Sequence, residues 1–506
     1  MTSRATPRPA SPPDSRPSPR PTSRPSPRPA PEGPAPEGPA PEGPAAERTA
    51  HRRDLLAAGG AALLVAVAAL VGTVIERANG SLHVNWPPLY ASWSPHLGPG
   101  TPAALAVAVL VIVHGPSLAA RLSWRRLVLS GWAAALAWTG ALALIDGWRT
   151  GIAGRLTTAY EYLTVIRRFD DLGPALRDFT HHILNNAPDH WPAHVAGHPP
   201  AAVLTFVGLD RIGLGGGGWA GIWCLTAGTS AVAAVLIALR ALTDEPTARR
   251  AAPFLVLTPA AVWVGTSADG YFAAVAAWSL ALLALAATHP TLPRLPLRGA
   301  PVPAAAALAS GLLLGLTCYL SYGLTLIALI AAAILLLTRT ARPLPFLAAG
   351  ALAVAAVFTL AGFSWWEGYQ LLVERYYQGA AAVRPYAYWV WANPACTVLL
   401  IGPATVAALR RTLTATPTAL RGLGPSAGPL RAPTARLAVL LAAVLLAVLA
   451  ADLSGMSKAE TERIWLPFAV WLPAACALLP TARHRPWLTA QAVPALLINH
   501  LLYTGW

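Results

Sequence analysis

The segment LLAAGGAALLVAVAALVGTVI, residues 55–75, decides the class of fold, because it holds no charged side chain over a length that crosses a bilayer. A transmembrane helix needs about 20 predominantly apolar residues, since each advances the axis by about 1.5 Å through a core of about 30 Å. Arg52 and Arg53 stand just before this segment, and such arginines usually stay in the cytoplasm. The segment predicts a first span whose N-terminal end is cytoplasmic.

Apolar runs of similar length recur along the rest of the chain. Of its 506 residues, 55% are hydrophobic and only 12% are charged, whereas soluble domains carry about 25% charged residues. The sequence therefore predicts an all-α polytopic membrane protein with about thirteen transmembrane helices. The expected spans are 55–75, 102–121, 127–146, 218–241, 251–267, 271–288, 302–319, 322–338, 344–362, 393–409, 437–452, 465–481 and 487–504.

Arginines in the short loops orient these spans. Arg126, Arg250, Arg339 and Arg411 all fall in loops that the scheme places in the cytoplasm, and the C-terminus then lies outside. The scheme requires that residues 199–216 do not cross the membrane fully. The charges and glycines of this segment favour a juxtamembrane or re-entrant helix. If it does cross, every later span reverses.

The chain divides into four parts by composition. Residues 1–50 are rich in proline, arginine and serine and almost lack apolar side chains, which predicts a disordered cytoplasmic tail. Two N-terminal spans occupy 51–126. A core with the external loop 147–200 covers 127–290, and further spans with external loops 363–392 and 452–464 cover 291–506.

Charge and cysteine usage exclude other classes of protein. The formal net charge is +15, but the basic residues lie in the tail and in short loops, a topological pattern that does not predict nucleic-acid binding. The four cysteines lie in apolar segments without CxxC spacing, so neither a zinc site nor a disulfide framework is predicted. They are Cys224, Cys318, Cys396 and Cys476.

Acidic and histidine side chains gather in the external loop 147–200. Asp146 ends an otherwise apolar span, and Glu161 lies between two tyrosines. A carboxylate at the membrane edge either reaches water or serves a function. Adjacent histidines on a helix do not converge, so the pair His181 and His182 does not predict a metal site. The histidines of this loop are His181, His182, His190, His194 and His198.

The segment HVAGHPPAAVLTFVGLDRIG, residues 194–213, resembles the His-Pro-Pro entry of polyprenyl-phosphate-sugar-dependent glycosyltransferases of the GT-C superfamily. That class includes protein mannosyltransferases and lipid A aminoarabinose transferases. The order of features is also similar: an acid after an early outward span, a long external loop, the HPP entry, and TSADG at 266–270. The resemblance covers about residues 127–290 and implies a GT-C-like fold, with short helices in the large first external loop.

The resemblance implies transfer of a sugar from a polyprenyl-phosphate donor to an envelope glycan, lipid or protein at the external face of the cell membrane. A carboxylate would deprotonate the acceptor hydroxyl, and Asp146 and Glu161 are the candidates. The family often has an adjacent Asp-Glu pair, whereas Gly147 follows Asp146 here. Which acid is the base is therefore open. No metal-binding residue is assigned, and a divalent cation is left open as a cofactor.

Transfer also needs cations that stabilise the phosphate leaving group. The substrate-binding candidates on the external side are His198, Asp269, Arg375, Arg384, Lys458 and Arg463. For Lys458 and Arg463, a local network with Glu460 and Glu462 is the competing interpretation. The alternatives to a transferase are a lipid-linked sugar transporter or flippase and a non-catalytic envelope membrane protein. A transporter would show an internal repeat or charged, broken helices at mid-membrane.

Overall fold

The computed structural model describes residue 2 and residues 44–288, 302–424 and 430–505. The chain splits into two units, 1–49 and 50–506, and the helical bundle belongs to the second. Most of the tail predicted to be disordered lies outside the described residues. The prediction for its last part was wrong, because helix α1 already begins at Pro44. A proline at the start, two alanines and Glu47 in the first turn favour helix there.

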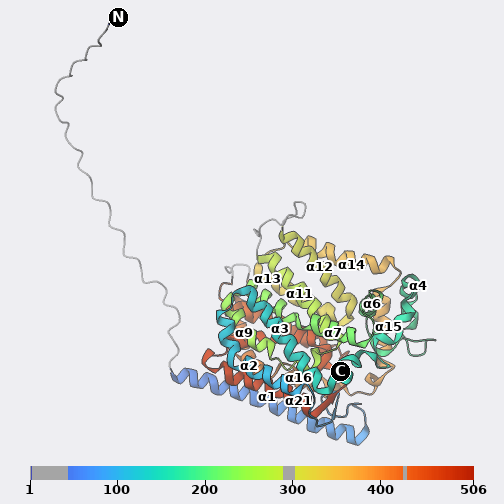
Figure 1. Ribbon diagram of the computed structural model, residues 1–506, viewed down its shortest axis with the longest axis horizontal. Coiled ribbons are helices and arrows are strands. Elements are labelled where there is room, and N and C mark those ends of the chain that lie inside the picture. The colour runs from blue at the N-terminus through green and yellow to red at the C-terminus, as the bar shows by residue number, and fades with distance from the viewer. Residues whose placement is uncertain (1, 3–43, 289–301, 425–429, 506) are drawn as a thin grey trace, which may run out of the picture. The chain divides into compact units, whose positions relative to one another are not determined.

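The described residues are almost entirely helical (Figure 1). The longer helices are α1 (Pro44–Asn79), α2 (Thr101–Arg121), α3 (Trp124–Ala143), α6 (Ala201–Arg211), α7 (Gly217–Thr229), α8 (Ala231–Leu242), α9 (Glu245–Val256), α11 (Ala268–Thr288), α12 (Val302–Leu320), α13 (Ile327–Thr338), α14 (Leu344–Leu360), α15 (Trp365–Tyr377), α16 (Tyr386–Ile401), α17 (Pro403–Arg421), α18 (Pro433–Leu453) and α21 (His484–Leu501). The shorter ones are η1 (Leu144–Asp146), η2 (Arg149–Ala153), η3 (Arg155–Thr157), η4 (Tyr162–Phe169), α4 (Leu172–Arg177), η5 (Phe179–His182), α5 (Ala193–Gly197), α10 (Ala261–Val264), η6 (Tyr322–Leu326), η7 (Ala380–Ala382), α19 (Thr461–Ile464), α20 (Leu466–Ala469), η8 (Leu472–Leu478) and η9 (Thr481–Arg483).

The fold class predicted from the sequence is confirmed: this is an all-α, multi-pass membrane protein. In the described part, seven helices are long and apolar enough to cross a membrane, and three bent helix pairs raise the number to ten. Three differences separate ten from the thirteen expected spans. Segment 251–267 is broken, 322–338 falls short of the length required, and 465–481 with 487–504 forms one bent pair.

The break in 251–267 falls at a proline. Helix α9 ends at Val256, Pro259 lies in the following turn, and the one-turn helix α10 ends before Gly265. Proline has no N–H to donate, so a helix does not run through it without cost. All the side chains from 251 to 267 are buried. A broken backbone is tolerated at membrane depth where protein covers it.

Two other expected spans bend rather than run straight. Helices α16 and α17 meet at 111°, so the expected span 393–409 was wrong as one straight helix. Gly402 takes a left-handed φ of 77° at the corner, and Pro403 starts the next helix. Glycine accepts such a φ without the strain that a Cβ would add. Beyond 344–360 the chain turns by 76° into α15, so the expected loop 363–392 is largely helical.

Two features near the chain ends were not predicted. The described residues form one two-stranded antiparallel sheet, in which β1 (Ala91–Trp93) pairs with β2 (Leu502–Thr504). The last expected span therefore ends at Leu501, and the strand ties the end of the chain to the loop after α1. Helix α6 covers Ala201–Arg211, 11 residues, and is about 16 Å long, too short to cross the bilayer alone. This agrees with the expectation for 199–216.

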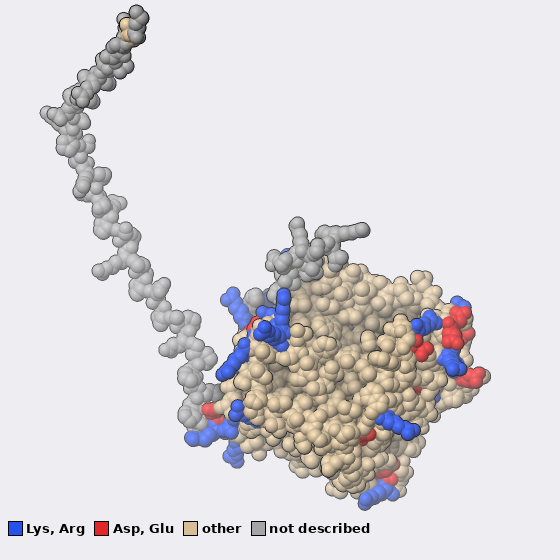
Figure 2. All heavy atoms as spheres, in the orientation of Figure 1, with Lys and Arg blue, Asp and Glu red and all other residues tan. Residues whose placement is uncertain are grey.

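Helix α11 is the central helix of the bundle. It packs against α7, α8, α12, α13 and α20, and nearly all of its side chains are buried (Figure 1). Charged side chains lie mainly at two opposite edges of the face in Figure 2, one near α9 and α13 and one near α4 and α15. The surface between them is almost free of charge, as a band in contact with lipid must be.

Candidate active site

A small polar pocket lies where the loop 147–200 meets two short breaks in the bundle, and its empty space of about 270 Å³ includes open solvent. Its walls come from η3 and η4 with α5, from the start of α11, and from α19. Segments far apart in the sequence thus converge on one small volume. The lining residues are Arg155, Glu161, Tyr162, His194, Thr266, Ser267, Ala268, Asp269 and Arg463.

The backbone before α11 brings Asp269 to this cavity. Thr266 has a left-handed φ of 61°, and its hydroxyl donates a hydrogen bond of 3.0 Å to the carbonyl of Gly151 in the first loop. The hydroxyl of Ser267 accepts from the amide of Gly270 and so caps the new helix. Asp269 stands in the first turn of α11, where the helix dipole favours a negative charge.

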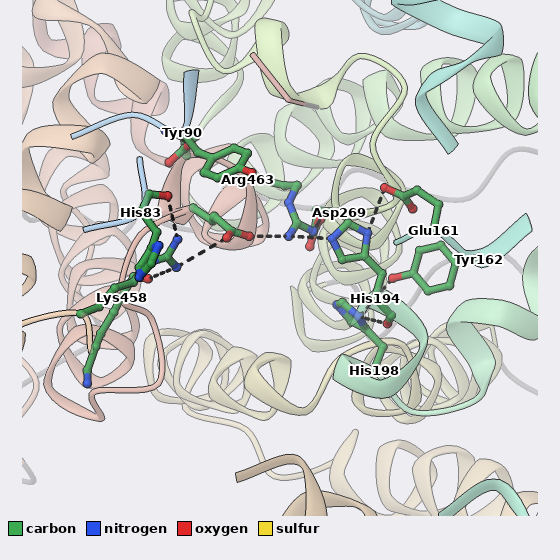
Figure 3. A network of polar contacts seen from close by, with 12 residues as sticks. His83, Tyr90, Glu161, Tyr162, His194, His198, Asp269, Lys458 and Arg463 are labelled. Carbon is green, nitrogen blue, oxygen red and sulfur yellow. Dashed lines mark hydrogen bonds and ion pairs between the residues drawn. The ribbon is translucent and has the colours of Figure 1, made fainter. Parts of the chain in front are cut away.

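Arg463 occupies the centre of the polar cluster (Figure 3). Its guanidinium lies 2.5 Å from the carboxylate of Asp269 and 3.2 Å from that of Glu460. Burial by itself would lower the pKa of Arg463, but the charges of Asp269, Glu460 and Glu161 outweigh it and raise the pKa. Arg463 is therefore a permanent cation in the wall of the cavity.

Glu161 is bound on one side only. Its Oε1 lies 2.9 Å from Nδ1 of His194. Its Oε2 is buried and has no hydrogen-bond partner among the residues that the structure describes. A buried carboxylate oxygen without a donor is costly, so this atom is ready to accept a hydrogen bond from a ligand.

Two neutral groups, Tyr162 in the cavity wall and His198 behind it, adjoin these residues. His198 sits 3.1 Å from the hydroxyl of Tyr162 and donates from Nδ1 to the carbonyl of His194 at 2.7 Å. Burial lowers the pKa of His198 to about 4, despite the nearby charge of Asp269. Burial, with Asp269 and Glu161, raises the pKa of Tyr162 well above its usual value. His198 supports the wall and does not itself line the cavity.

The other expected acid, Asp146, lies against two nitrogen groups, of which Arg155 makes a hydrogen bond. One of its oxygens lies 2.9 Å from Nη2 of Arg155 and the other lies 2.9 Å from Nε2 of His96. It does not line the cavity, whereas its partner Arg155 does. Arg155 also donates to the carbonyl of Thr504 in β2, so this pair couples the cavity wall to the C-terminal strand.

The three remaining expected cations lie away from the cavity. Arg384 donates to the carbonyls of Leu82 and Lys458 at 2.9 and 2.8 Å, which ties together two loops. Arg375 contacts the carbonyl of Trp191 at 3.4 Å. Lys458 donates to the carbonyl of Ala381 at 3.0 Å. Their contacts hold separate loops together.

Sequence reasoning missed Arg155, which lines the cavity, and His96, which contacts Asp146 outside it, and it undervalued His194. Neither Arg155 nor His96 stood out, because nothing in their local sequence distinguishes them. His194 was one of several loop histidines, yet it precedes His198 by four residues, the spacing that places two side chains on one helix face. That spacing was the available signal.

The donor set does not fit a divalent cation. Within the described ranges, no three His, Cys, Asp or Glu side chains lie close enough to hold a metal ion. The two carboxylates of the cavity each contact a nitrogen group, Glu161 through His194 and Asp269 through Arg463. We therefore derive no chemical step through a metal ion.

Fold and cavity together define a multi-pass membrane protein with an acid–arginine cluster buried at the ends of its helices. No protein-family model and no curated protein matches the sequence. Several solved structures are similar in fold. They include enzymes of the GT-C class that the sequence resemblance named.

One of these structures is the oligosaccharyltransferase of Archaeoglobus fulgidus, in a complex with Zn and sulfate. It is 16% identical with a TM-score of 0.44, and the match covers 74% of this chain and 52% of that chain. The same archaeal enzyme, AglB, with an inhibitory peptide and a dolichol-phosphate matches at 14% identity and a TM-score of 0.46, over 75% and 56% of the two chains.

ArnT from Cupriavidus metallidurans in the apo state matches at 14% identity and a TM-score of 0.41, over 69% of this chain and 59% of that chain. This chain thus spans little more than half the length of each of these proteins. Such identities and TM-scores establish neither an activity nor a substrate. A function must therefore rest on this chain's own residues.

Proposed function

We propose that this protein is a membrane glycosyltransferase that moves a sugar from a polyprenyl-phosphate donor to a cell-envelope acceptor at the external face, with Glu161 as the general base. The observation that carries the proposal is the buried, unpartnered Oε2 of Glu161 in the same cavity as Arg155 and Arg463. A free carboxylate oxygen and two guanidinium groups are the parts that such a transfer needs.

The position of the cavity supports a lipid-linked donor. Asp269 lies in the first turn of the apolar helix α11, and Arg463 lies just before the apolar segment that begins at Leu466. Both residues therefore stand at an end of a membrane-embedded element. A phosphate attached to a membrane lipid resides at that depth, whereas a soluble nucleotide sugar would have to leave water to reach it.

These residues account for each bond and proton that changes in the transfer. The acceptor hydroxyl attacks the anomeric carbon on the face opposite the phosphate and gives its proton to Oε2 of Glu161. The bond from the anomeric carbon to the phosphate oxygen breaks, and its electron pair leaves with the polyprenyl phosphate. Arg463 and Arg155 stabilise the negative charge on the departing phosphate. The new glycosidic bond has inverted configuration.

We propose Glu161 rather than Asp146 as the base. The sequence left both acids as candidates, but both oxygens of Asp146 lie against Arg155 and His96, whereas Oε2 of Glu161 has no hydrogen-bond partner among the described residues. Asp146 also lies outside the cavity lining, whereas Glu161 is part of it. We therefore assign Asp146 to holding Arg155 in place. Asp269 and Arg463 stay in the proposed substrate site, while Arg375, Arg384 and Lys458 are proposed to order the loops around it.

The test uses membranes from cells that produce the protein and from cells that produce Glu161→Gln. Membranes are supplied with radiolabelled polyprenyl-phosphate hexoses and pentoses, and the labelled product is identified. We expect transfer by the wild type and none by Glu161→Gln at equal protein level. Glu374→Gln, on exposed α15, is the matched control and should stay active. Absence of transfer by the wild type, or full turnover by Glu161→Gln, overturns the proposal.

A further inference from the structure

His194 contacts both the proposed base, Glu161, and the proposed phosphate-binding cation, Arg463. Its Nδ1 lies 2.9 Å from Oε1 of Glu161, and its Nε2 lies 3.5 Å from Nη2 of Arg463. Its side chain is 12% exposed, so water does not compete strongly for either nitrogen. The carboxylate proposed to act on the acceptor and the cation proposed to act on the phosphate are thus joined through one imidazole (Figure 3).

Hydrogen-bond chemistry decides which nitrogen carries the proton. A guanidinium only donates, so Nε2 of His194 must accept from Arg463. A neutral imidazole with an accepting Nε2 carries its proton on Nδ1. That proton points at Oε1 of Glu161, and the contact is a donation from His194 to the carboxylate.

The backbone holds His194 in this position from both sides. Its amide donates to the carbonyl of Tyr160 at 3.1 Å, and its carbonyl accepts from Nδ1 of His198 at 2.7 Å. His198 follows α5 and precedes the two prolines that start the next helix. The ring of His194 is thereby fixed relative to Glu161.

We propose that His194 is a positioning residue: it holds Oε1 of Glu161 and so directs the free Oε2 toward the acceptor hydroxyl. This proposal rests on the proposed function. His194 does not relay the proton, because its Nδ1 already carries one and its Nε2 is directed at a cation. Loss of the hydrogen bond lets the carboxylate rotate, and a displacement of about 1 Å costs roughly 100-fold in rate.

Two amide substitutions of His194 test the contacts of its two ring nitrogens separately. The amide of asparagine lies where Nδ1 of histidine lies, so His194→Asn keeps a donor to Glu161 and loses the contact with Arg463. The longer glutamine places its amide where Nε2 lies, so His194→Gln does the reverse. We expect His194→Asn to keep kcat within about tenfold of the wild type and His194→Gln to lose about 100-fold in kcat, with the donor KM little changed.

The same sugar-transfer assay supplies the control and distinguishes the outcomes. His181→Asn changes an exposed histidine of the same loop and should match the wild type. Equal loss in both His194 variants, equal retention in both, or the reverse order overturns the positioning role. If the wild type itself transfers no sugar, the proposed function fails and this proposal with it, whereas an active wild type with the wrong order overturns this proposal alone.

A measurement without turnover checks the geometry. Nitrogen NMR of histidine-labelled protein distinguishes the two neutral tautomers from the charged ring, and His194→Asn assigns the His194 signals by their disappearance. We expect a protonated Nδ1 and a bare Nε2. A proton on Nε2, in the neutral or the charged ring, overturns the proposal.

Discussion

Asp269 and Arg463, separated by 194 positions in the sequence, form an ion pair of 2.5 Å inside the cavity. Both side chains are almost fully buried. The pair joins the first turn of α11 to the short helix α19, which follow two different breaks in the bundle. A buried pair of this kind makes each residue necessary to the other, because either charge alone would lie unpaired in a poorly solvated space.

Breaking this pair should destabilise the protein more than removing it. Arg463→Met leaves the Asp269 carboxylate buried without its cation, which costs about 3–5 kcal/mol in the free energy of unfolding. The double variant Asp269→Asn/Arg463→Met removes both charges and should recover most of that stability without recovering transfer. Thermal unfolding in detergent measures this. A double variant as unstable as Arg463→Met would contradict the pairing account.

A conservative change tests the role of Arg463 in donor binding. Arg463→Lys keeps the charge but loses the planar fork that matches two phosphate oxygens. We expect the KM for the donor to rise roughly tenfold at unchanged protein level. Arg375→Lys, outside the cavity, is the control and should leave the donor KM unchanged. A fall in stability with donor affinity retained would make Arg463 structural and return attention to Arg375 or Arg384.

Substitutions of Glu161 and Asp146 allow the catalytic roles of the two acids to be compared directly. Glu161→Gln removes the proposed base, and general-base catalysis is worth roughly 100- to 10,000-fold in rate. Asp146→Asn weakens the hold on Arg155 only, so we expect a loss of roughly tenfold. Initial rates at saturating donor, normalised to folded protein, measure both. A larger loss in Asp146→Asn would restore Asp146 as the base.

Glu462 should make stability depend on pH. It is completely buried, and burial first, then the charge of Glu460, raises its pKa from 4.5 to about 7. The unfolded chain therefore ionises near pH 4.5 while the folded protein keeps the proton. Stability from this group is full below pH 4.5, falls as the pH rises to about 7, and is constant above, a loss of roughly 3 kcal/mol.

The variant Glu462→Gln isolates this effect. It cannot ionise, so it should be more stable than the wild type above pH 7 and equally stable near pH 4. Melting temperatures in detergent from pH 4 to 8 measure the difference. Glu76→Gln, in α1, is a control for the loss of a glutamate. A difference between wild type and Glu462→Gln that does not change with pH would refute the assignment.

Membrane topology can be tested by reporter fusions. Asp54 lies 2.5 Å from Nη2 of Arg410 and 2.6 Å from that of Arg411, so the start of α1 and the middle of α17 share one membrane face. Fusions after residues 126 and 411 should report the cytoplasm, and a fusion after 190 the exterior. An external signal at 411 together with a cytoplasmic signal at 126 would contradict this shared face.

The class of fold follows from local composition. Uninterrupted apolar runs such as 55–75 and 437–452 become helices α1 and α18, because a chain in lipid must satisfy its own backbone hydrogen bonds. The helix start after His198, Pro199 and Pro200 was also readable, since proline restricts where a helix can begin. These features depend on local composition, and local composition was sufficient to predict them.

Packing between distant segments selects which polar residues meet. Glu161 and Asp146 look alike in the sequence, yet one has a free oxygen in the cavity and the other is held by Arg155 and His96. Arg463 reaches Asp269 because Thr266 turns the backbone just before α11. Partners that lie hundreds of positions apart are chosen by packing, through the cost of burying a charge without a counter-charge, and no local pattern records that cost.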